Sequence, residues 1–358
     1  MTSTHALRAD WYSPPGQTIS DVLQHRKISH EEFANHMSLT SDELWRLLEG
    51  VDTITDELAD RLSRELGSTP QFWLAREAQY RADRARLQKP APTADEKQWL
   101  RELPISDMVR FGWLRAANSV SERVEACLQF FEVTSIEEWR SKAEVSAAFR
   151  TSPKFKSELG AVAAWLRQGE IQAATIQCAR WDREKLKAVL PTLRTLTRKK
   201  EPVAFLPELT AKCAECGVAV VIVRAPKGCH TSGATRFISK HKALLMLSFR
   251  HLSDDQFWFT FFHEVGHLIL HKTKSVFVEW EDVPSSKEER EANEYAANTL
   301  VHPDVREAML ALPSEAKAIV RFALQIQVSP GIVVGQLQHH GRLRYNQLNT
   351  LKRRFRWE

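Results

Sequence analysis

One short segment, His263-Glu-Val-Gly-His267, constrains the fold of this 358-residue chain more than any other. It lies inside an apolar run that begins at Phe257 and ends at Leu270. In an α-helix, residues four apart lie one above the other, so the two histidines point the same way. A helix that is apolar on most sides is buried. Burying two imidazoles and a carboxylate is costly unless they are paired or bound to a metal, so the segment predicts a buried helix with a polar function.

The spacing of the two histidines is that of a metal site. Two imidazoles one helical turn apart can both reach one Zn²⁺ at about 2.0–2.1 Å. Glu264 lies about 100° further round the helix and is placed to take a proton from a metal-bound water. The metal lowers the pKa of that water towards about 7, which makes it a nucleophile for a peptide carbonyl. We expect the metal to be zinc. Manganese is the alternative, because histidine and glutamate ligands suit it as well.

A catalytic zinc site needs a third protein ligand, and a helical pattern about twenty residues later offers one. Glu289, Ala292 and Ala296 share one face of that helix. The small residues allow close approach to the histidine helix, which would bring Glu289 to the metal. We therefore expect Glu289 as the third ligand, with Glu291 and His271 as the alternatives.

The same segment also contains signals for the start of a helix. Ser286 with Glu289 fits a capping box, in which a hydroxyl and a carboxylate satisfy opposite backbone amides. Ser285 with Glu288 fits it equally well and leaves Glu289 available for the metal. We favour the second pairing.

Other polar residues near the motif are candidates for supporting roles. Asn293 lies one turn after Glu289 and can hold a ligand in place, and we expect a supporting or structural role for His271. His230 and His302, in or near predicted loops, could stabilise an oxyanion. An ordinary polar role is favoured for both.

Strand patterns precede the histidine helix. The β-branched run Val218–Val223 indicates a buried strand, and Ala234–Ser239 and Ala243–Phe249 are further candidates. We expect one sheet edge near Ala234–Ser239 to bind a substrate as an added strand. Ser253 with Gln256 predicts a capping box at the start of the following helix.

The stretch from about Gly217 to Pro303 resembles the ImmA/IrrE family of metallopeptidases. The resemblance rests on Asp255–Thr260, on the segment His263–His271 that follows it, and on the later pattern Glu-x-x-Ala-Asn-x-x-Ala. It implies a zincin-like α+β domain with His263, His267 and Glu289 as ligands and Glu264 as general base. It also implies a protein substrate, namely a repressor or an antitoxin-like DNA-binding protein.

Residues 18–80 contain a series of short helices with start signals. Ser29 with Glu32 and Thr40 with Glu43 fit capping boxes, and a tight connection at Ser38-Leu39 is typical of a helix-turn-helix. Residues 14–80 resemble the HigA-type antitoxin branch of the XRE helix-turn-helix regulators. The residues that carry this resemblance are Pro15-Gly16 before the first helix, Leu48-Glu49-Gly50 after the third, and Thr69–Leu74 opening the fifth.

The charge of this region argues against an ordinary DNA reader. Residues 1–87 hold ten Arg or Lys against fourteen Asp or Glu, although the whole chain carries +5. Affinity for DNA comes mainly from cations that neutralise phosphates. The recognition helix would offer Thr40, Ser41, Trp45 and Arg46 to a major groove, with only Arg46 able to make a bidentate contact to guanine. The module can instead dimerise or dock a partner protein, so a homodimer is possible.

These patterns predict a mainly α chain with a small α+β domain. We expect a five-helix helix-turn-helix bundle in residues 1–88, a helical middle region in 89–200, and a zincin-like domain with a short mixed sheet in 201–358. Cys213 and Cys216 are interpreted as packing residues. The basic and aromatic tail 352–357 is interpreted as a solvated charged end, with binding of nucleic acid or of an acidic protein as the alternative.

The predicted function is a transcriptional regulator or antitoxin-like protein that carries a zinc-dependent endopeptidase. The alternative is an antitoxin that acts by binding a toxin and its promoter DNA, with an idle or structural metal site. The sequence shows no membrane-spanning run and no signal peptide, and we expect a cytoplasmic protein.

Overall fold

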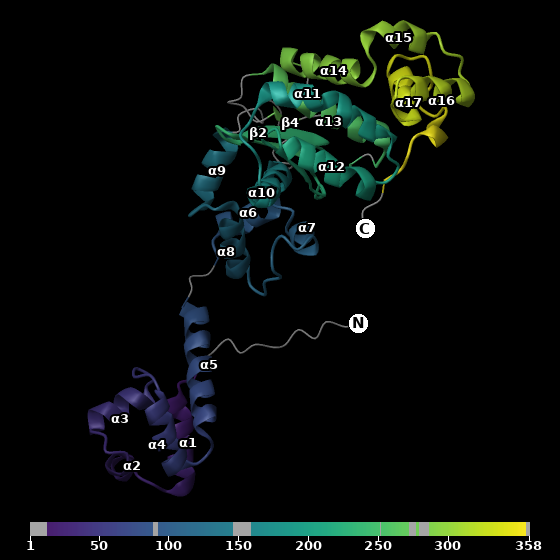
Figure 1. Cartoon of the computed structure of the whole chain (residues 1–358). Helices are drawn as coiled ribbons and strands as arrows, with labels where there is room; N and C mark the ends of the chain where they lie inside the picture. The colour runs from purple at the N-terminus through teal and green to yellow at the C-terminus, as the bar shows by residue number, and fades with distance from the viewer. Residues whose placement is uncertain are drawn as a thin grey trace. The chain divides into compact units, whose positions relative to one another are not determined.

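The computed structural model describes residues 13–88, 92–145, 159–250, 252–271, 277–278 and 286–355, with side chains described except at 86–88, 143–145 and 277–278. The chain forms two compact units, Met1–Ala91 and Pro92–Glu358. In Figure 1 the first unit runs from purple to blue and the second from blue through green to yellow. The predicted class, mainly α with a small mixed sheet, is confirmed.

Within residues 13–88, five helices make up the first unit: α1 (Pro15–Arg26), α2 (His30–His36), α3 (Ser41–Leu48), α4 (Asp56–Leu66) and α5 (Pro70–Gln88). The predicted capping box of Thr40 and Glu43 is present in both directions at the start of α3. Pro15 and Gly16 begin α1 rather than precede it. A Cβ on Gly16 would lie 1.9 Å from the carbonyl oxygen of Leu48, so α1 packs directly against the end of α3.

The middle region belongs to the second unit. Its helices are α6 (Ala94–Glu102), α7 (Ile105–Arg110), α8 (Val120–Phe131), α9 (Ile136–Val145) and α10 (Leu159–Thr175). Helix α10 contacts α6 and α8 and also packs against the sheet, where the Trp165 indole donates a hydrogen bond to the Val223 carbonyl at 2.9 Å. The boundary that we predicted near residue 200 therefore does not separate two compact units, because α10 is apolar on both sides.

The sheet of the second unit has four strands among the described residues, in the order β1-β3-β2-β4. They are β1 (Val218–Ile222), β2 (Gly233–Ser239), β3 (Lys242–Leu247) and β4 (Phe277–Val278). Strands β1 and β3 are parallel, and β2 is antiparallel to both of its neighbours. Val220 packs into one hydrophobic cluster and Val221 into another, so both faces of β1 are buried. This burial explains the unbroken apolar run in the sequence.

The edge that we expected to bind a substrate strand is partly covered. The antiparallel partner of Ala234 is Val278, and that of Thr235 is Phe277. The chain itself therefore supplies a neighbour for the first part of this edge, and substrate binding there stays a prediction.

The remaining elements of the second unit are helical. They are α11 (Arg183–Thr195), a 3₁₀ turn η3 (Leu196–Arg198), α12 (Pro202–Ala214), α13 (Asp254–Leu270), α14 (Lys287–Leu300), α15 (Pro303–Leu310), α16 (Ala316–Gln325), α17 (Pro330–His339) and a 3₁₀ turn η4 (Asn349–Leu351). Helix α13 is buried along almost its whole length and contacts α14, α17, β2 and β3. It is the central element of the unit.

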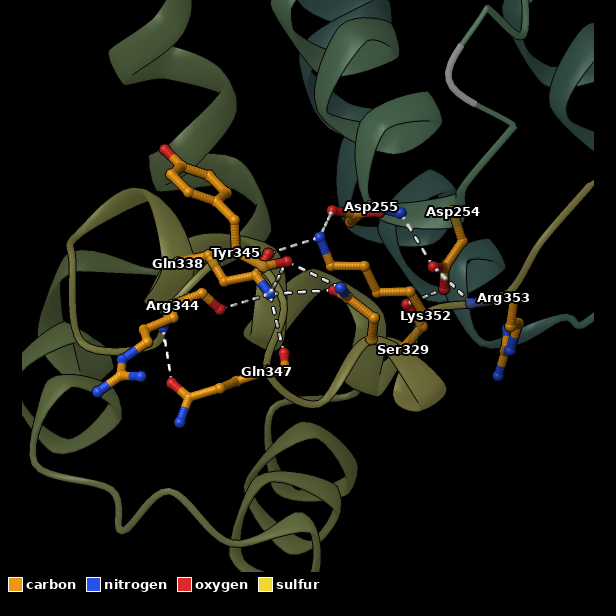
Figure 2. Close-up of polar contacts among 10 residues, drawn as sticks. Asp254, Asp255, Ser329, Gln338, Arg344, Tyr345, Gln347, Lys352 and Arg353 are labelled. Atoms are coloured by element: carbon orange, nitrogen blue, oxygen red, sulfur yellow. Dashed lines mark hydrogen bonds and ion pairs between the residues drawn. The ribbon is translucent and has the colours of Figure 1, made fainter.

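The described part of the basic tail, residues 352–355, packs against the rest of the unit and does not extend into solvent. Lys352 is largely buried and forms an ion pair with Asp255 in the first turn of α13, with 2.6 Å between Nζ and Oδ2 (Figure 2). The backbone amide of Arg353 donates to Asp254, and its guanidinium donates to two carbonyls near η3. Phe355 is buried in the main core. Residues 344–355, here called the C-terminal clasp, therefore anchor the start of α13, which corrects the prediction; Arg356 and Trp357 lie outside the described residues.

Among the described residues, no single helix is both long and apolar enough to cross a membrane. Helices α16 and α17 would meet the requirement only as a pair, and they bend by 111° at their junction.

Candidate metal centre

Helix α13 carries the predicted metal-site histidines on its buried side. The side chain of Ser253, its N-cap residue, forms no capping hydrogen bond to a described residue, so the predicted capping box with Gln256 is wrong. The carboxylate of Asp254 accepts the amide hydrogen of Asp255 instead. Ser253 forms a β-bridge with Arg354 of the C-terminal clasp, which fixes the entry into the helix.

Three side chains converge at the middle of this helix. The Nε2 atoms of His263 and His267 lie 3.0 Å apart. The two carboxylate oxygens of Glu289 lie 3.2 Å from the Nε2 of His263 and 3.3 Å from the Nε2 of His267. Both histidines are fully buried, and the Glu289 side chain is 25% exposed. The structure thus brings together the three residues that we predicted as ligands.

This donor set fits a divalent transition metal. Ligand atoms that each lie about 2.0–2.1 Å from a tetrahedral Zn²⁺ are roughly 3.3 Å apart, close to the three separations observed here. Two neutral imidazoles and one carboxylate are also one of the common ligand sets of catalytic zinc sites, which keep a fourth position open.

Hydrogen bonds around the cluster favour the protonation states that a metal needs. Asn293 Oδ1 lies 2.9 Å from His263 Nδ1, and because the amide oxygen can only accept, this contact favours a proton on Nδ1. The Nε2 of His263, on the other side of the ring, faces Glu289 and His267 and is the nitrogen that would bind a metal. Asn293 lies where the sequence placed a supporting residue.

The charges of the cluster follow from burial and from these contacts. Burial lowers the pKa of His267, and its hydrogen bond with Glu289 opposes that shift. Burial by itself raises the pKa of Glu289, but hydrogen bonds with His263 and His267 outweigh it and hold this pKa at about 2. At neutral pH, Glu289 is therefore ionised and His267 is neutral.

Glu289 reaches the histidines because α13 and α14 pack closely. A Cβ added to Gly266 would lie 3.2 Å from the Cα of Ala292, so the two helices approach at small residues. The N-cap of α14 is Ser286, whose hydroxyl accepts from the amide of Glu289 at 3.2 Å. We favoured Ser285 as the cap, and this residue lies outside the described residues. In the structure Ser286 caps the helix by accepting from the backbone amide of Glu289. The side-chain carboxylate of Glu289 still faces the histidines.

The alternatives for the third ligand lie elsewhere. His271 follows the last residue of α13 in an extended conformation. Its Nε2 lies 3.2 Å from the carbonyl oxygen of Glu288, and its Nδ1 lies 3.8 Å from Glu291. Neither His271 nor Glu291 belongs to the cluster of metal-ligating atoms.

Glu264 is buried next to the histidines and receives a hydrogen bond that the sequence analysis missed. The hydroxyl of Thr235, on β2, donates to its Oε2 at 2.9 Å. A Cβ on Gly233 would lie 2.5 Å from its Oε1, so this glycine leaves room for the carboxylate. A threonine and a glycine within a buried strand are weak signals, and nothing in the sequence connects them with a residue about thirty positions later.

Comparison with known proteins places this site in a family. Residues 218–334, about one third of the chain, match the family model Peptidase_M78, described as the IrrE N-terminal-like domain. The match includes β1, the three converging side chains and Glu264. Residues 218–334 form an IrrE N-terminal-like domain. Because this family is metal-dependent in general, the His-His-Glu cluster is its candidate metal site.

The N-terminal part of the chain has a relative among curated proteins. A segment of 60 residues, 17% of this chain, is 40% identical to a protein of Escherichia coli strain K12 described as the uncharacterized HTH-type transcriptional regulator YddM. The chain spans 64% of the length of that relative. The chain thus joins a helix-turn-helix domain to an IrrE N-terminal-like domain.

The predicted DNA-contacting residues lie at the start and on the surface of α3. Thr40 is engaged in the capping box, Ser41 is exposed, and Trp45 has 58% of its surface exposed. The guanidinium of Arg46 is held by Asp52 in a bidentate ion pair, with a shortest distance of 2.7 Å. The one predicted guanine reader is therefore already paired within its own unit.

The two outlying histidines are surface residues. The carbonyl and ring of His230 both contact Arg250, and His302 caps α15 through its Nδ1.

The two cysteines that we interpreted as packing residues lie in a hydrophobic core. Cys213 and Cys216 are both buried in the hydrophobic cluster that also contains side chains of β1, β3 and α13. Burial raises the pKa of the Cys213 thiol.

Proposed function

We propose that the IrrE N-terminal-like domain is a metal-dependent endopeptidase that hydrolyses a peptide bond in a partner regulatory protein in the cytoplasm. The class of substrate that we propose is a repressor or a component of a toxin–antitoxin pair. The observation that carries this proposal is the buried cluster of His263, His267 and Glu289 with the carboxylate of Glu264 beside it.

His263, His267 and Glu289 would hold the metal, and zinc fits this donor set, with manganese as the alternative. A divalent cation held by these residues would polarise a carbonyl and make water more acidic. The protein supplies the proton transfers. Glu264 accepts a proton from the attacking water and delivers it to the leaving amine. The hydroxyl of Thr235 holds the carboxylate of Glu264 in place for both steps.

The proposal is tested with the full chain and its Glu264→Gln variant, which keeps the shape of the side chain but cannot accept the proton. We expect zinc at one equivalent in both proteins by elemental analysis. Incubation with a cell extract of the source organism should produce new protein N-termini with the wild type, at a rate about 100-fold or more above that of the variant. Glu307→Gln, an exposed glutamate on α15, is the matched control and should cleave like the wild type.

New N-termini that form equally fast with Glu264→Gln would overturn the assignment of Glu264. Their absence in all three proteins, with zinc bound, would overturn the endopeptidase.

A second candidate function is regulation by binding alone, in which the chain represses a promoter or neutralises a toxin. The relative that is described as an HTH-type transcriptional regulator favours it. The same variant separates the two functions. If Glu264→Gln represses its promoter and neutralises its toxin as well as the wild type does, peptide hydrolysis is not needed for that role.

A further inference from the structure

A groove in the middle region has no part in the steps above. It is lined by residues between Lys97 and Ala126 and is here called the basic groove. It has a volume of about 680 Å³ and lies among α6, α7, the segment that follows α7, and the first half of α8 (Figure 1). A volume of several hundred Å³ is typical of sites that bind a ligand.

The floor of the basic groove is aliphatic. The side chains that form it are half-buried, and they are Leu100, Ile105, Val109, Leu114 and Val120. An apolar strip of this kind, rimmed by polar residues, is typical of a surface that binds a partner. Among the described residues that line the groove, none is aromatic, so it offers no ring on which a nucleobase can stack.

The rim of the basic groove carries positive charge. Lys97, Arg101, Arg115 and Arg123 line it, and all four are exposed. None of the four forms an ion pair with another residue in the described part of the chain. The Nε of Arg123 donates to the carbonyl oxygen of Ala117 at 3.4 Å, which holds this guanidinium beside the groove.

No acidic residue of the surrounding helices lines the basic groove. The acidic residues of α6, α7 and α8 are Asp95, Glu96, Glu102, Asp107, Glu122 and Glu125. Asp95 and Asp107 form ion pairs with arginines outside the groove. Glu96 and Glu122 belong to the capping boxes of α6 and α8. These carboxylates reduce the positive potential around the groove, but they leave its four cations without an ion-pair partner.

One wall of the basic groove combines charge with an apolar contact. Lys97 and Arg101 lie one turn apart on α6, and Leu100 beside them contributes to the floor. Like charges at this spacing slightly destabilise a helix, so the pair does not serve the stability of α6. An acidic partner would relieve this repulsion. An amphipathic helix binds in such a groove with its apolar face inwards and its charged residues towards the rim.

The helices around the basic groove are joined directly to the sheet part of the second unit. A Cβ on Gly160 of α10 would lie 2.1 Å from the carbonyl oxygen of Glu102, so α6 ends against α10. The carboxylate of Asp107 accepts the backbone amide of Lys227, which follows β1, at 2.6 Å. A partner held in the groove is therefore held on the compact unit that contains the metal centre.

We propose that the basic groove docks an acidic, amphipathic helical segment of a partner protein. The apolar face of that helix lies on the aliphatic floor, and its carboxylates face Lys97, Arg101 and Arg123. The cations come from three different elements, so carboxylates spaced along a peptide can reach several of them, whereas the single head group of a small anion reaches one part of the rim. The inference concerns binding and does not depend on peptide hydrolysis.

The experiment measures binding of three fluorescein-labelled peptides to the full chain by fluorescence anisotropy. Each peptide has about 18 residues, which is roughly five helical turns. The first has leucines on one face and glutamates on the other. The second has the same composition with its leucines spread around the helix, and the third has lysine in place of every glutamate.

We expect the first peptide to bind with a Kd below about 100 μM. The second should bind about tenfold more weakly, because it has no continuous apolar face. The third should not bind measurably, because the rim repels it. Absence of saturable binding of the first peptide would overturn the proposal, and so would equal binding of the first peptide and either of the others.

A matched pair of double variants locates the bound peptide. Lys97→Gln with Arg101→Gln removes two cations of the rim and should weaken the first peptide about tenfold. Lys317→Gln with Arg321→Gln removes the same residue types at the same spacing from the exposed surface of α16 and should leave the affinity unchanged. If the two double variants bind equally well, the peptide binds elsewhere and the proposal is wrong.

A second pair of variants tests the end of the groove on α8. Ala126→Glu places a carboxylate in the groove and should weaken the first peptide at least tenfold, whereas Ala308→Glu makes the same change on the surface of α15 and should not. Equal affinities of these two variants would contradict the proposed location.

Two further probes test other occupants, and one variant separates docking from hydrolysis. Oligothymidylate and decanoate represent nucleic acid and a small anionic amphiphile. If either binds more tightly than the first peptide and loses affinity in the Lys97 and Arg101 double variant, the groove serves another class of ligand and the proposal is wrong. Glu264→Gln should bind the first peptide like the wild type, so a failure of docking leaves the proposed endopeptidase untouched.

Discussion

The metal centre and the surface of α3 both consist of residues that the sequence singled out, yet they differ in what surrounds them. In the metal centre, His263, His267 and Glu289 converge on one another in the interior. On α3, Arg46 turns aside to Asp52, and Trp45 faces solvent. Burying three potential ligands costs desolvation free energy, which has to be offset by pairing or by a bound metal, so the cluster indicates a function. An exposed charged residue costs little desolvation, and an ion pair with a neighbour changes the stability little, so its presence alone does not indicate a function.

The largest effect is expected from a change of the proposed third ligand, Glu289. Replacing Glu289 with Gln removes the negative charge while keeping the size of the side chain, so zinc affinity should fall more than 100-fold. Glu291→Gln is the matched control on the same helix and should change zinc affinity little. Competition with a chromophoric chelator measures both. Equal losses in the two variants would place the metal elsewhere.

The hydrogen bond behind His263 should contribute less. Asn293→Ala leaves the Nδ1 proton of His263 without its acceptor, and zinc affinity should fall by about 10–100-fold. Asn293→Asp keeps an acceptor oxygen at the same place and should retain most of the affinity. The chelator competition applies here too, and the idea fails if the aspartate variant loses as much as the alanine variant.

The smallest effects belong to the surface of α3. If the unit binds DNA through α3, Asp52→Asn releases Arg46 and removes a negative charge near the phosphates, so affinity should rise severalfold. Arg46→Gln should lower it by a similar factor. Fluorescence anisotropy with the upstream DNA of the chain's own gene, at two salt concentrations, measures both. An unchanged affinity in both variants would mean that DNA is not bound through this helix.

The sequence predicted most where a local pattern carries its own geometry. The i, i+4 spacing of His263 and His267 fixes their common direction on a helix. The small residues on α14 indicate close helix packing, and they placed Glu289 correctly against the pair. The five helices of the first unit followed from capping residues such as Thr40.

It predicted least where distant segments meet. Thr235 reaches Glu264 only because β2 lies beside α13, and Lys352 reaches Asp255 across almost one hundred positions. A basic, aromatic ending has the composition of a solvated tail, although it folds back on the core. The pairing of β4 with the edge of β2 was not predicted either, because it also joins segments that are far apart in the sequence.

Because of the C-terminal clasp, the two units cannot finish folding at the same time during translation. The first turn of α13 is held by Lys352 and Arg353, which are translated about one hundred residues after it. While the nascent chain is still on the ribosome, the first unit can fold by itself, because domains generally fold as units. The candidate metal centre gains its last support only after these residues have left the ribosome. A chain whose synthesis stops early would thus carry the helix-turn-helix without a finished metal site.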